Sequence, residues 1–221
     1  MKDATHIAVL LDRSGSMGEV KAETISGFNH FLKEQKSAGD NATLTLVQFD
    51  SEGIDTVFNA EPIKDVPDLT PETYEPRSWT PLLDALGKTI NDTGTHLANT
   101  SENERPDKVV FVVITDGQEN ASREFTKARI KEMINHQSDV YKWQFVYLGA
   151  NQDAFAEAQG MGMKRDNVAN YEAARMNDAF AFTTANVARY RRTGVAASLK
   201  YSTPQRDELM KKEEKEETTQ D

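Results

Sequence analysis

The most constraining feature of the chain is an apolar run, residues 6–11, that passes directly into Asp12-Arg13-Ser14-Gly15-Ser16. A short continuous apolar run is expected for a central parallel strand that is covered on both faces. The segment after it places one carboxylate and two hydroxyls in alternation at the C-terminal end of that strand. Ligand sites of α/β proteins lie at this end of the sheet, and Mg2+ prefers small oxygen ligands. The stretch therefore predicts either a metal site or a helix cap, because serine is also a preferred N-cap residue.

Strand and helix signals alternate along the rest of the chain. The expected strands are residues 7–11, 43–49, 54–58, 109–114, 143–148 and 167–170. The expected helices are residues 20–36, 82–90, 124–137, 151–159 and 171–192. This order predicts an α/β domain with a largely parallel sheet, helices on both faces, and residues 54–58 as an edge strand. Because residues 43–49 alternate between apolar and polar, we expect that strand to be half-exposed.

The C-terminal segment differs in composition from the rest of the chain. The 221 residues suffice for one domain with a sizeable core. Residues 203–221 are nearly free of apolar side chains and are dominated by lysine and glutamate. We therefore expect a single domain over residues 1–202, followed by a charged tail that is disordered or forms a frayed, solvated helix.

Charge and composition argue against several classes of function. The net charge of -10 disfavours binding to nucleic acid, which requires a basic face, and binding to an anionic membrane. The absence of cysteine excludes disulfides, thiolate zinc sites and cysteine nucleophiles. No apolar stretch approaches the ~20 residues that span a bilayer, and no signal peptide pattern precedes the first strand. The expected compartment is the cytoplasm.

Two further loops carry oxygen ligands after or before expected elements. Thr80 stands just before the helix at residues 82–90, and Asp116 follows the most apolar strand, residues 109–114. If this strand lies beside the first one, Asp12 and Asp116 face each other across the end of the sheet. Ser14, Ser16 and Thr80 would then complete a ring of oxygen atoms. Asp116-Gly117 could also be an ordinary turn, but its place after the most apolar strand favours a functional role.

These three segments, in this order, resemble the von Willebrand factor A (VWA) domain and its metal-ion-dependent adhesion site (MIDAS). The family pattern is Asp-x-Ser-x-Ser, then a threonine, then an aspartate, and the similarity extends over roughly residues 5–193. The resemblance implies a Rossmann-like, doubly wound, mostly parallel sheet with one antiparallel edge strand. It also implies a Mg2+ ion, with Mn2+ or Ca2+ as alternatives. The ligands implied are Asp12, Ser14, Ser16, Thr80 and Asp116.

The same resemblance implies a role in protein–protein interaction. Two carboxylates balance the charge of the cation while the hydroxyls add none, so the ion remains able to bind an Asp or Glu of a partner. Stand-alone intracellular relatives in bacteria and phages work with AAA+ ATPases or in stress-response assemblies, which makes these the expected partner classes. The residues expected at the partner-binding rim are Arg13, Met17, Trp79, Gln118 and Glu119.

One departure from the family pattern affects this rim. Many relatives have glycines just before the threonine, whereas this chain has Ser78 and Trp79, so less backbone freedom is expected there. Trp79 could line the rim or cover the edge of the core.

Enzymatic alternatives fit the motifs less well. A haloacid-dehalogenase-like phosphatase requires a second aspartate two residues after the first, where this chain has Ser14. The chain has no phosphate-binding P-loop and no Gly-x-Ser-x-Gly nucleophile motif. We therefore expect a binding module rather than an enzyme. The alternatives are a Mg2+-dependent phosphoryl hydrolase and a structural module whose metal only stabilises the fold.

Overall fold

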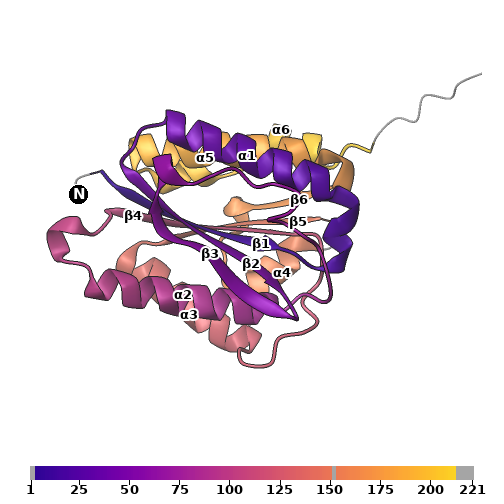
Figure 1. Cartoon of the computed structure of the whole chain (residues 1–221), viewed down its shortest axis with the longest axis horizontal. Coiled ribbons are helices and arrows are strands. Elements are labelled where there is room, and N and C mark those ends of the chain that lie inside the picture. Colours follow the sequence, from indigo (N-terminus) through magenta and orange to yellow (C-terminus); the bar gives the residue numbers. More distant parts are fainter. Residues whose placement is uncertain (1–2, 151–152, 213–221) are drawn as a thin grey trace, which may run out of the picture.

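The computed structural model describes residues 3–150 and 153–212, and over these residues the chain forms a six-stranded sheet between two layers of helices (Figure 1). The strands are β1 (Thr5–Asp12), β2 (Ala42–Asp50), β3 (Gly53–Pro62), β4 (Lys108–Thr115), β5 (Gln144–Ala150) and β6 (Val168–Tyr171). The α-helices are α1 (Lys21–Ser37), α2 (Leu82–Asn99), α3 (Lys127–Tyr141), α4 (Ala154–Gly160), α5 (Met176–Thr193) and α6 (Thr203–Leu209). The first two residues of the helix expected at 151–159 lie outside the described residues.

The sheet has the order β3-β2-β1-β4-β5-β6. β1 pairs in parallel with both β2 and β4, the pairs β4–β5 and β5–β6 are also parallel, and β3 runs antiparallel to β2. The predicted fold class, including the antiparallel edge strand, is confirmed. Because the chain extends the sheet first on one side of β1 and then on the other, the topological switch lies between β1 and β4. Ligands of such sheets bind at the C-terminal ends of the strands at this switch.

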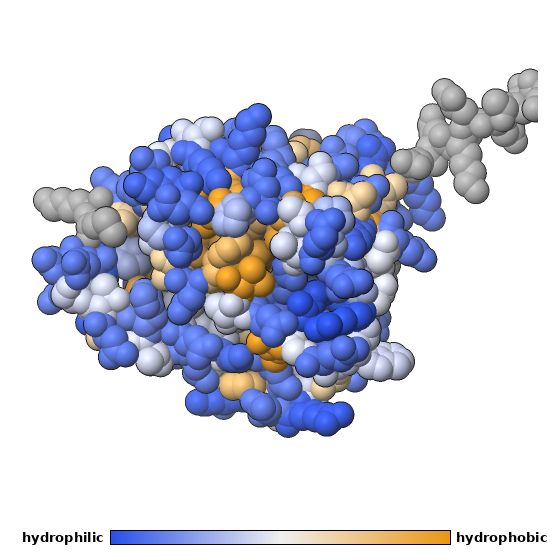
Figure 2. Space-filling model, viewed as in Figure 1, coloured by the Kyte–Doolittle hydropathy of each residue, from blue (hydrophilic) through white to orange (hydrophobic). Residues whose placement is uncertain are grey.

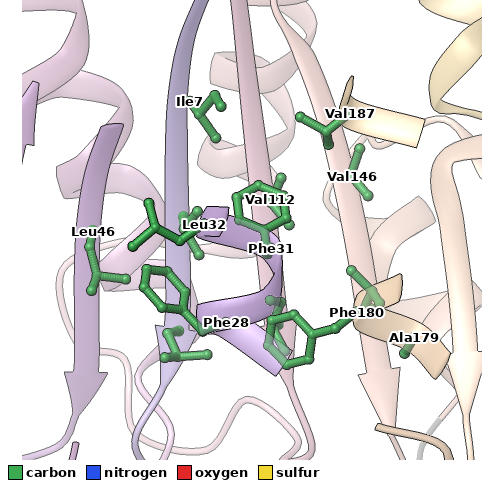
Figure 3. Packing of buried hydrophobic residues seen from close by; sticks show 14 of the residues in the cluster. Ile7, Phe28, Phe31, Leu32, Leu46, Val112, Val146, Ala179, Phe180 and Val187 are labelled. Carbon is green, nitrogen blue, oxygen red and sulfur yellow. The ribbon is translucent and has the colours of Figure 1, made fainter. Parts of the chain in front are cut away.

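Both faces of the sheet are covered, which explains the unbroken apolar run of β1. Ile7, Val9 and Leu11 belong to the core under α1 and α5, whereas Ala8 and Leu10 belong to the core under α2, α3 and α4. Side chains of α1 and α5 meet over the first of these faces (Figure 3). The two helices approach closely, because a Cβ atom on Gly27 of α1 would lie 2.2 Å from the Phe180 ring of α5.

β2 differs from the half-exposed strand that we expected. All of its residues except Thr43 are buried. Its polar side chains are satisfied inside the molecule: Thr45 Oγ1 accepts a hydrogen bond from the amide of Ala60, and Gln48 Nε2 donates to the carbonyl of Thr73. The alternation therefore reflects internal hydrogen bonding rather than an exposed face.

The chain also remains ordered beyond the expected boundary at residue 203. Residues 203–209 form α6, which begins with a capping box between Ser202 and Gln205. Leu209 is fully buried in the core beneath α1 and α5. The expectation of a tail from residue 203 is therefore wrong for this segment, because its one large apolar side chain docks on the domain. Residues 213–221 of the expected tail lie outside the described residues.

The surface in Figure 2 is mostly hydrophilic, with apolar side chains gathered near the centre of the face where Figure 1 places β3. Val57 of β3 is one of the exposed large apolar residues. Within the described residues, no helix combines the length and the apolar character needed to cross a membrane.

Candidate metal centre

The predicted ligands converge at the C-terminal ends of β1 and β4. Three connecting segments meet there: loop 1 (residues 13–16), loop 2 (residues 75–81) and loop 3 (residues 116–126). The β1–β4 register pairs Leu11 with Ile114, so the chain emerges from both strands side by side. Adjacent parallel strands therefore bring together residues that lie about a hundred positions apart.

Asp12 is fully buried at the base of the site. Its Oδ1 accepts a hydrogen bond of 2.7 Å from the amide of Ser14, and its Oδ2 accepts one of 2.5 Å from the hydroxyl of Thr115. Its main-chain carbonyl accepts a hydrogen bond of 2.6 Å from the hydroxyl of Tyr74. Neither Thr115 nor Tyr74 was predicted to belong to the site, although Thr115 directly precedes the predicted ligand Asp116.

The two serines join loop 1 to loop 3. The hydroxyls of Ser14 and Ser16 lie 3.2 Å apart, and the hydroxyl of Ser16 donates a hydrogen bond of 2.6 Å to Oδ1 of Asp116. Ser14 stands at the N-cap position of a short 3-10 helix, residues 15–20, but its side chain makes no capping hydrogen bond. The geometry therefore favours the interpretation of these serines as ligands over their interpretation as helix caps.

Gly117 locates the point at which the three loops converge. A Cβ atom at this position would lie 2.6 Å from Thr80 Oγ1, 3.5 Å from Ser14 Oγ and 3.6 Å from Asp12 Oδ2. Oxygen atoms of three predicted ligands thus surround one small volume that only a glycine leaves free. The structure brings together all five predicted ligands, because Ser16 and Asp116 are joined to this group through Ser14.

The five predicted ligands differ in their exposure to solvent. Asp12, Ser14 and Thr80 are buried, Asp116 is half-buried and Ser16 is exposed. Burial raises the pKa of Asp12 to about 6, an effect that hydrogen bonds from Thr115 and Ser14 oppose and that Asp116 reinforces. Burial likewise raises the pKa of Asp116. The hydrogen bonds to these carboxylates come from neutral donors, and a bound cation would offset the same cost of burial.

Loop 2 and loop 3 are fixed to each other beside the ligands. The amide of Thr80 donates to Oδ1 of Asn120, and its carbonyl accepts from the Asn120 amide. Asp84 of α2 accepts hydrogen bonds from three consecutive amides of loop 3, at residues 123–125. Glu119 accepts from the amides of Leu83, Ala121 and Ser122. No sequence motif marks these residues, because their hydrogen bonds go either to a segment about 40 residues away or to their own turn.

The departure from the family pattern in loop 2 has a structural consequence. Ser78 has a φ of 64°, in the left-handed region that glycine adopts more readily. Ser51, in the turn between β2 and β3, holds this conformation. Its hydroxyl is hydrogen-bonded to that of Ser78, its amide donates to the carbonyl of Trp79, and its Oγ accepts from the Trp79 amide.

The five residues predicted for the rim differ in their exposure to solvent. Trp79 is 66% exposed and Gln118 is exposed, as expected of rim residues. Met17 is fully buried, so its assignment to the rim is wrong, because the short helix at residues 15–20 turns this side chain into the core. Arg13 is also buried and forms ion pairs with Asp50 and Asp55, away from the ligands. Glu119 is half-buried and occupied by its hydrogen bonds to the turn.

The donor set suits a hard cation. Among the described residues, no three His, Cys, Asp or Glu side chains are grouped so that they could hold a metal ion. The site instead combines two carboxylates with three hydroxyls. Oxygen ligands of this kind match Mg2+, Mn2+ or Ca2+ better than a metal that prefers imidazole or thiolate.

The model of the von Willebrand factor type A domain family matches residues 6–185. The chain belongs to this family. No curated protein sequence matches the chain.

Solved structures agree with the VWA fold. Proximal thread matrix protein 1 (PTMP1) from the mussel byssus superimposes with a TM-score of 0.61 at 15% identity, covering 82% of this chain and 47% of that chain. A further structure of PTMP1, described as having a zinc-occupied MIDAS motif, gives a TM-score of 0.60 at 17% identity, with the same coverage of 82% and 47%. A von Willebrand factor type A protein from Catenulispora acidiphila gives 0.56 at 14% identity, covering 89% of this chain and 42% of that chain. This chain therefore spans less than half the length of each of these structures.

Proposed function

We propose that this VWA domain binds a protein partner through a Mg2+ ion held by Asp12, Ser14, Ser16, Thr80 and Asp116. The observation that carries the proposal is the convergence of Thr80, Ser14 and Asp12 oxygens around Gly117, within 3.6 Å of one point. The Ser16–Asp116 hydrogen bond adds the remaining two ligands to the same group. The zinc-occupied MIDAS motif of the mussel protein supports metal binding at this place in the fold.

The ligand chemistry supports binding of an acidic residue. The two aspartates balance the charge of a divalent cation, and the three hydroxyls leave its affinity for anions intact. Mg2+ keeps water at positions that the protein does not fill, and a carboxylate of the partner would replace such a water. Because Ser16 is exposed and Asp116 is half-exposed, the open end of the site faces the solvent from which a partner approaches.

We further propose that the partner contacts the groove beside loop 2. This groove has a volume of about 960 Å³ and is bounded by the β2–β3 turn, the first half of α2 and loop 3. Trp79 lines it and is 66% exposed, directly next to the ligand Thr80. Exposed tryptophans are enriched where proteins bind each other, because they bury much apolar area with little loss of conformational freedom.

We propose binding without turnover. The groups hydrogen-bonded to Asp12 are the Ser14 amide and the hydroxyls of Thr115 and Tyr74. Burial raises the pKa of Tyr74 well above its ordinary value, so its hydroxyl remains protonated and donates to the Asp12 carbonyl. None of these groups is a general base at neutral pH, and the carboxylates of Asp12 and Asp116 are themselves the proposed ligands of the cation, which leaves neither free to accept a proton.

Affinity purification from a cell lysate tests the proposal, with Mg2+ or with EDTA. We expect a specific partner to be retained by the wild type in Mg2+ and lost in EDTA or with Asp12→Ala. Asp166→Ala is the matched control, because it removes an exposed carboxylate that pairs with Lys200. If EDTA and Asp12→Ala leave the retained proteins unchanged while Mg2+ still raises the melting temperature, the metal has only a structural role.

A further inference from the structure

An ion-pair cluster forms around the buried carboxylate of Asp50, at the end of β2 and next to the metal centre. The side chain of Asp50 is 0% exposed, and its Oδ2 lies 2.6 Å from Arg13 Nε and 3.0 Å from Arg77 Nε. Its Oδ1 accepts hydrogen bonds from the amides of Glu52 and Gly53, which closes the β2–β3 turn. One carboxylate therefore contacts loop 1, loop 2 and the turn at the same time.

Arg13 reaches this cluster because of its place between two ligands. In an extended chain, successive side chains point to opposite sides. Asp12 and Ser14 face the metal centre, so the side chain of Arg13 points away from it. Its Nη2 lies 2.7 Å from Oδ2 of Asp55 on β3 in addition to the contact with Asp50. Both ion pairs tie the start of loop 1 to the β2–β3 hairpin.

Main-chain hydrogen bonds extend the same connection to the ligand positions. The Arg13 amide donates to the carbonyl of Phe49, and the Arg77 amide donates to the carbonyl of Arg13. The Gly15 amide donates to the carbonyl of Ser78, two residues before the ligand Thr80. Loop 1 is thus held between the end of β2 and loop 2. These main-chain bonds require loops 1 and 2 to lie at the separation that the two arginines set through Asp50.

We propose that Asp50, acting through Arg13 and Arg77, is a positioning residue that sets the affinity of the centre for its divalent cation without contacting the ion. This inference rests on the proposed metal site. Residues that orient metal ligands from behind commonly change metal affinity by about 10–100-fold when they are substituted. Asp50 holds two of the three ligand loops, so we expect Asp50→Asn to weaken metal binding by at least about tenfold.

A purely electrostatic effect predicts a different pattern. Arg13 and Arg77 place two cations near a site for a dication, and the carboxylate of Asp50 neutralises them. If this neutralisation were the only role of Asp50, the double variant Asp50→Asn/Arg13→Gln would recover metal affinity, because one unpaired cation is removed. If Asp50 positions the loops, the double variant binds metal as weakly as Asp50→Asn.

The experiment titrates the metal-free chain with Mn2+, followed by electron paramagnetic resonance, and with Mg2+, followed by calorimetry. It compares the wild type, Asp50→Asn, the double variant and the control Asp166→Asn, which loses an exposed ion pair with Lys200. Circular dichroism verifies that each variant is folded. Should Asp50→Asn fail to fold, Arg77→Gln breaks one arm of the cluster at a 45% exposed side chain, with a smaller loss of affinity expected.

Amide hydrogen exchange of the metal-free protein supplies a second measurement. In Asp50→Asn we expect faster exchange at Gly15 and Arg77, whose amides bridge the loops, with unchanged rates in β5. The positioning role of Asp50 would be overturned if Asp50→Asn bound metal as tightly as the wild type, or if the double variant recovered that affinity. Either result would leave the proposed function intact. A wild type that binds neither Mn2+ nor Mg2+ would instead overturn the proposed function together with this inference.

Discussion

Ser16 donates a hydrogen bond of 2.6 Å to Oδ1 of Asp116, although the two residues lie 100 positions apart in the chain. The bond links loop 1 to loop 3 at the open end of the site, where Ser16 is exposed. The same two residues are predicted to bind the cation. In the metal-free protein the hydrogen bond therefore holds the two ligands near each other before the cation arrives.

The first prediction concerns this hydroxyl. Ser16→Ala removes one oxygen ligand, and we expect a loss of Mg2+ affinity at least as large as the ~10–100-fold caused by losing an outer partner of a ligand. Because Ser16 is exposed, the free energy of unfolding without metal should change by no more than about 0.5 kcal/mol. Calorimetric titration and urea unfolding measure the two quantities. Ser37→Ala is the control, since this serine is also exposed and its hydroxyl bonds only within α1. Equal metal affinities in the two variants would contradict the assignment of Ser16 as a ligand.

The second prediction concerns the space beside Gly117. Gly117→Ala would place a methyl group 2.6 Å from Thr80 Oγ1, so loop 3 or Thr80 must move. We expect metal affinity to fall by at least about tenfold, as for other changes that misplace ligands, and overpacking to cost about 1–3 kcal/mol of stability. Metal titration and thermal unfolding test both effects.

Gly94 provides the matched control for that substitution. A Cβ atom there meets nothing within 4 Å, and the residue lies inside α2. Gly94→Ala should leave metal affinity unchanged and stabilise the protein by about 0.5–1 kcal/mol, because alanine favours the helix. Unchanged metal binding in Gly117→Ala would show that the three oxygens do not surround the cation.

The sequence was sufficient to predict that the five proposed ligands lie together, because they stand at the ends of regular elements. Asp12 and Asp116 end or directly follow strands that are adjacent and parallel, so the topology alone brings them together. The same reasoning would have placed Arg13 away from its two neighbours, since side chains alternate in an extended segment, but we assigned it to the rim. The burial of Met17 was not predictable, because it depends on a short 3-10 helix that the sequence did not indicate.

The supporting contacts were beyond prediction from the sequence for a physical reason. Asp50 binds side chains 37 and 27 residues away, and nothing in its immediate surroundings in the sequence marks it as buried. By contrast, α6 carried a usable signal. Ser202 and Gln205 form a capping box before Leu209, but the high density of charged residues in this segment led us to predict a tail.

The third prediction tests whether α6 belongs to the domain. Leu209 is 0% exposed, whereas its neighbour Met210 is 44% exposed. Leu209→Ala should lower the free energy of unfolding by about 2–5 kcal/mol, as for other buried leucines, and Met210→Ala should change it by no more than about 0.5 kcal/mol. Urea unfolding gives both values. Similar stabilities of the two variants would mean that α6 is not docked in solution.

The fourth prediction concerns pH. His6 is buried in β1, and its Nδ1 lies 2.9 Å from Thr43 Oγ1. Burial, with a smaller contribution from His96, lowers the pKa of His6 to about 4 from 6.5. Between these values the unfolded chain binds a proton that the native protein does not, so stability from this residue is full above about pH 6.5 and falls as the pH drops toward 4.

Asp12 acts in the opposite direction in the metal-free protein. Because burial raises its pKa to about 6, the native state binds a proton that the unfolded chain releases, and acidification from pH 6 toward 4 is stabilising through this residue. The two effects partly cancel, so the wild-type profile alone does not isolate His6.

The comparison must be made with His6→Asn, which retains a polar atom near Thr43 and does not titrate. The stability of His6→Asn relative to wild type should rise by about 2–3 kcal/mol between about pH 7 and pH 4.5, since each unit of pKa shift corresponds to ~1.4 kcal/mol. Urea unfolding of metal-free protein at the two pH values measures it, and parallel profiles of wild type and variant would mean that His6 is not buried in its neutral form.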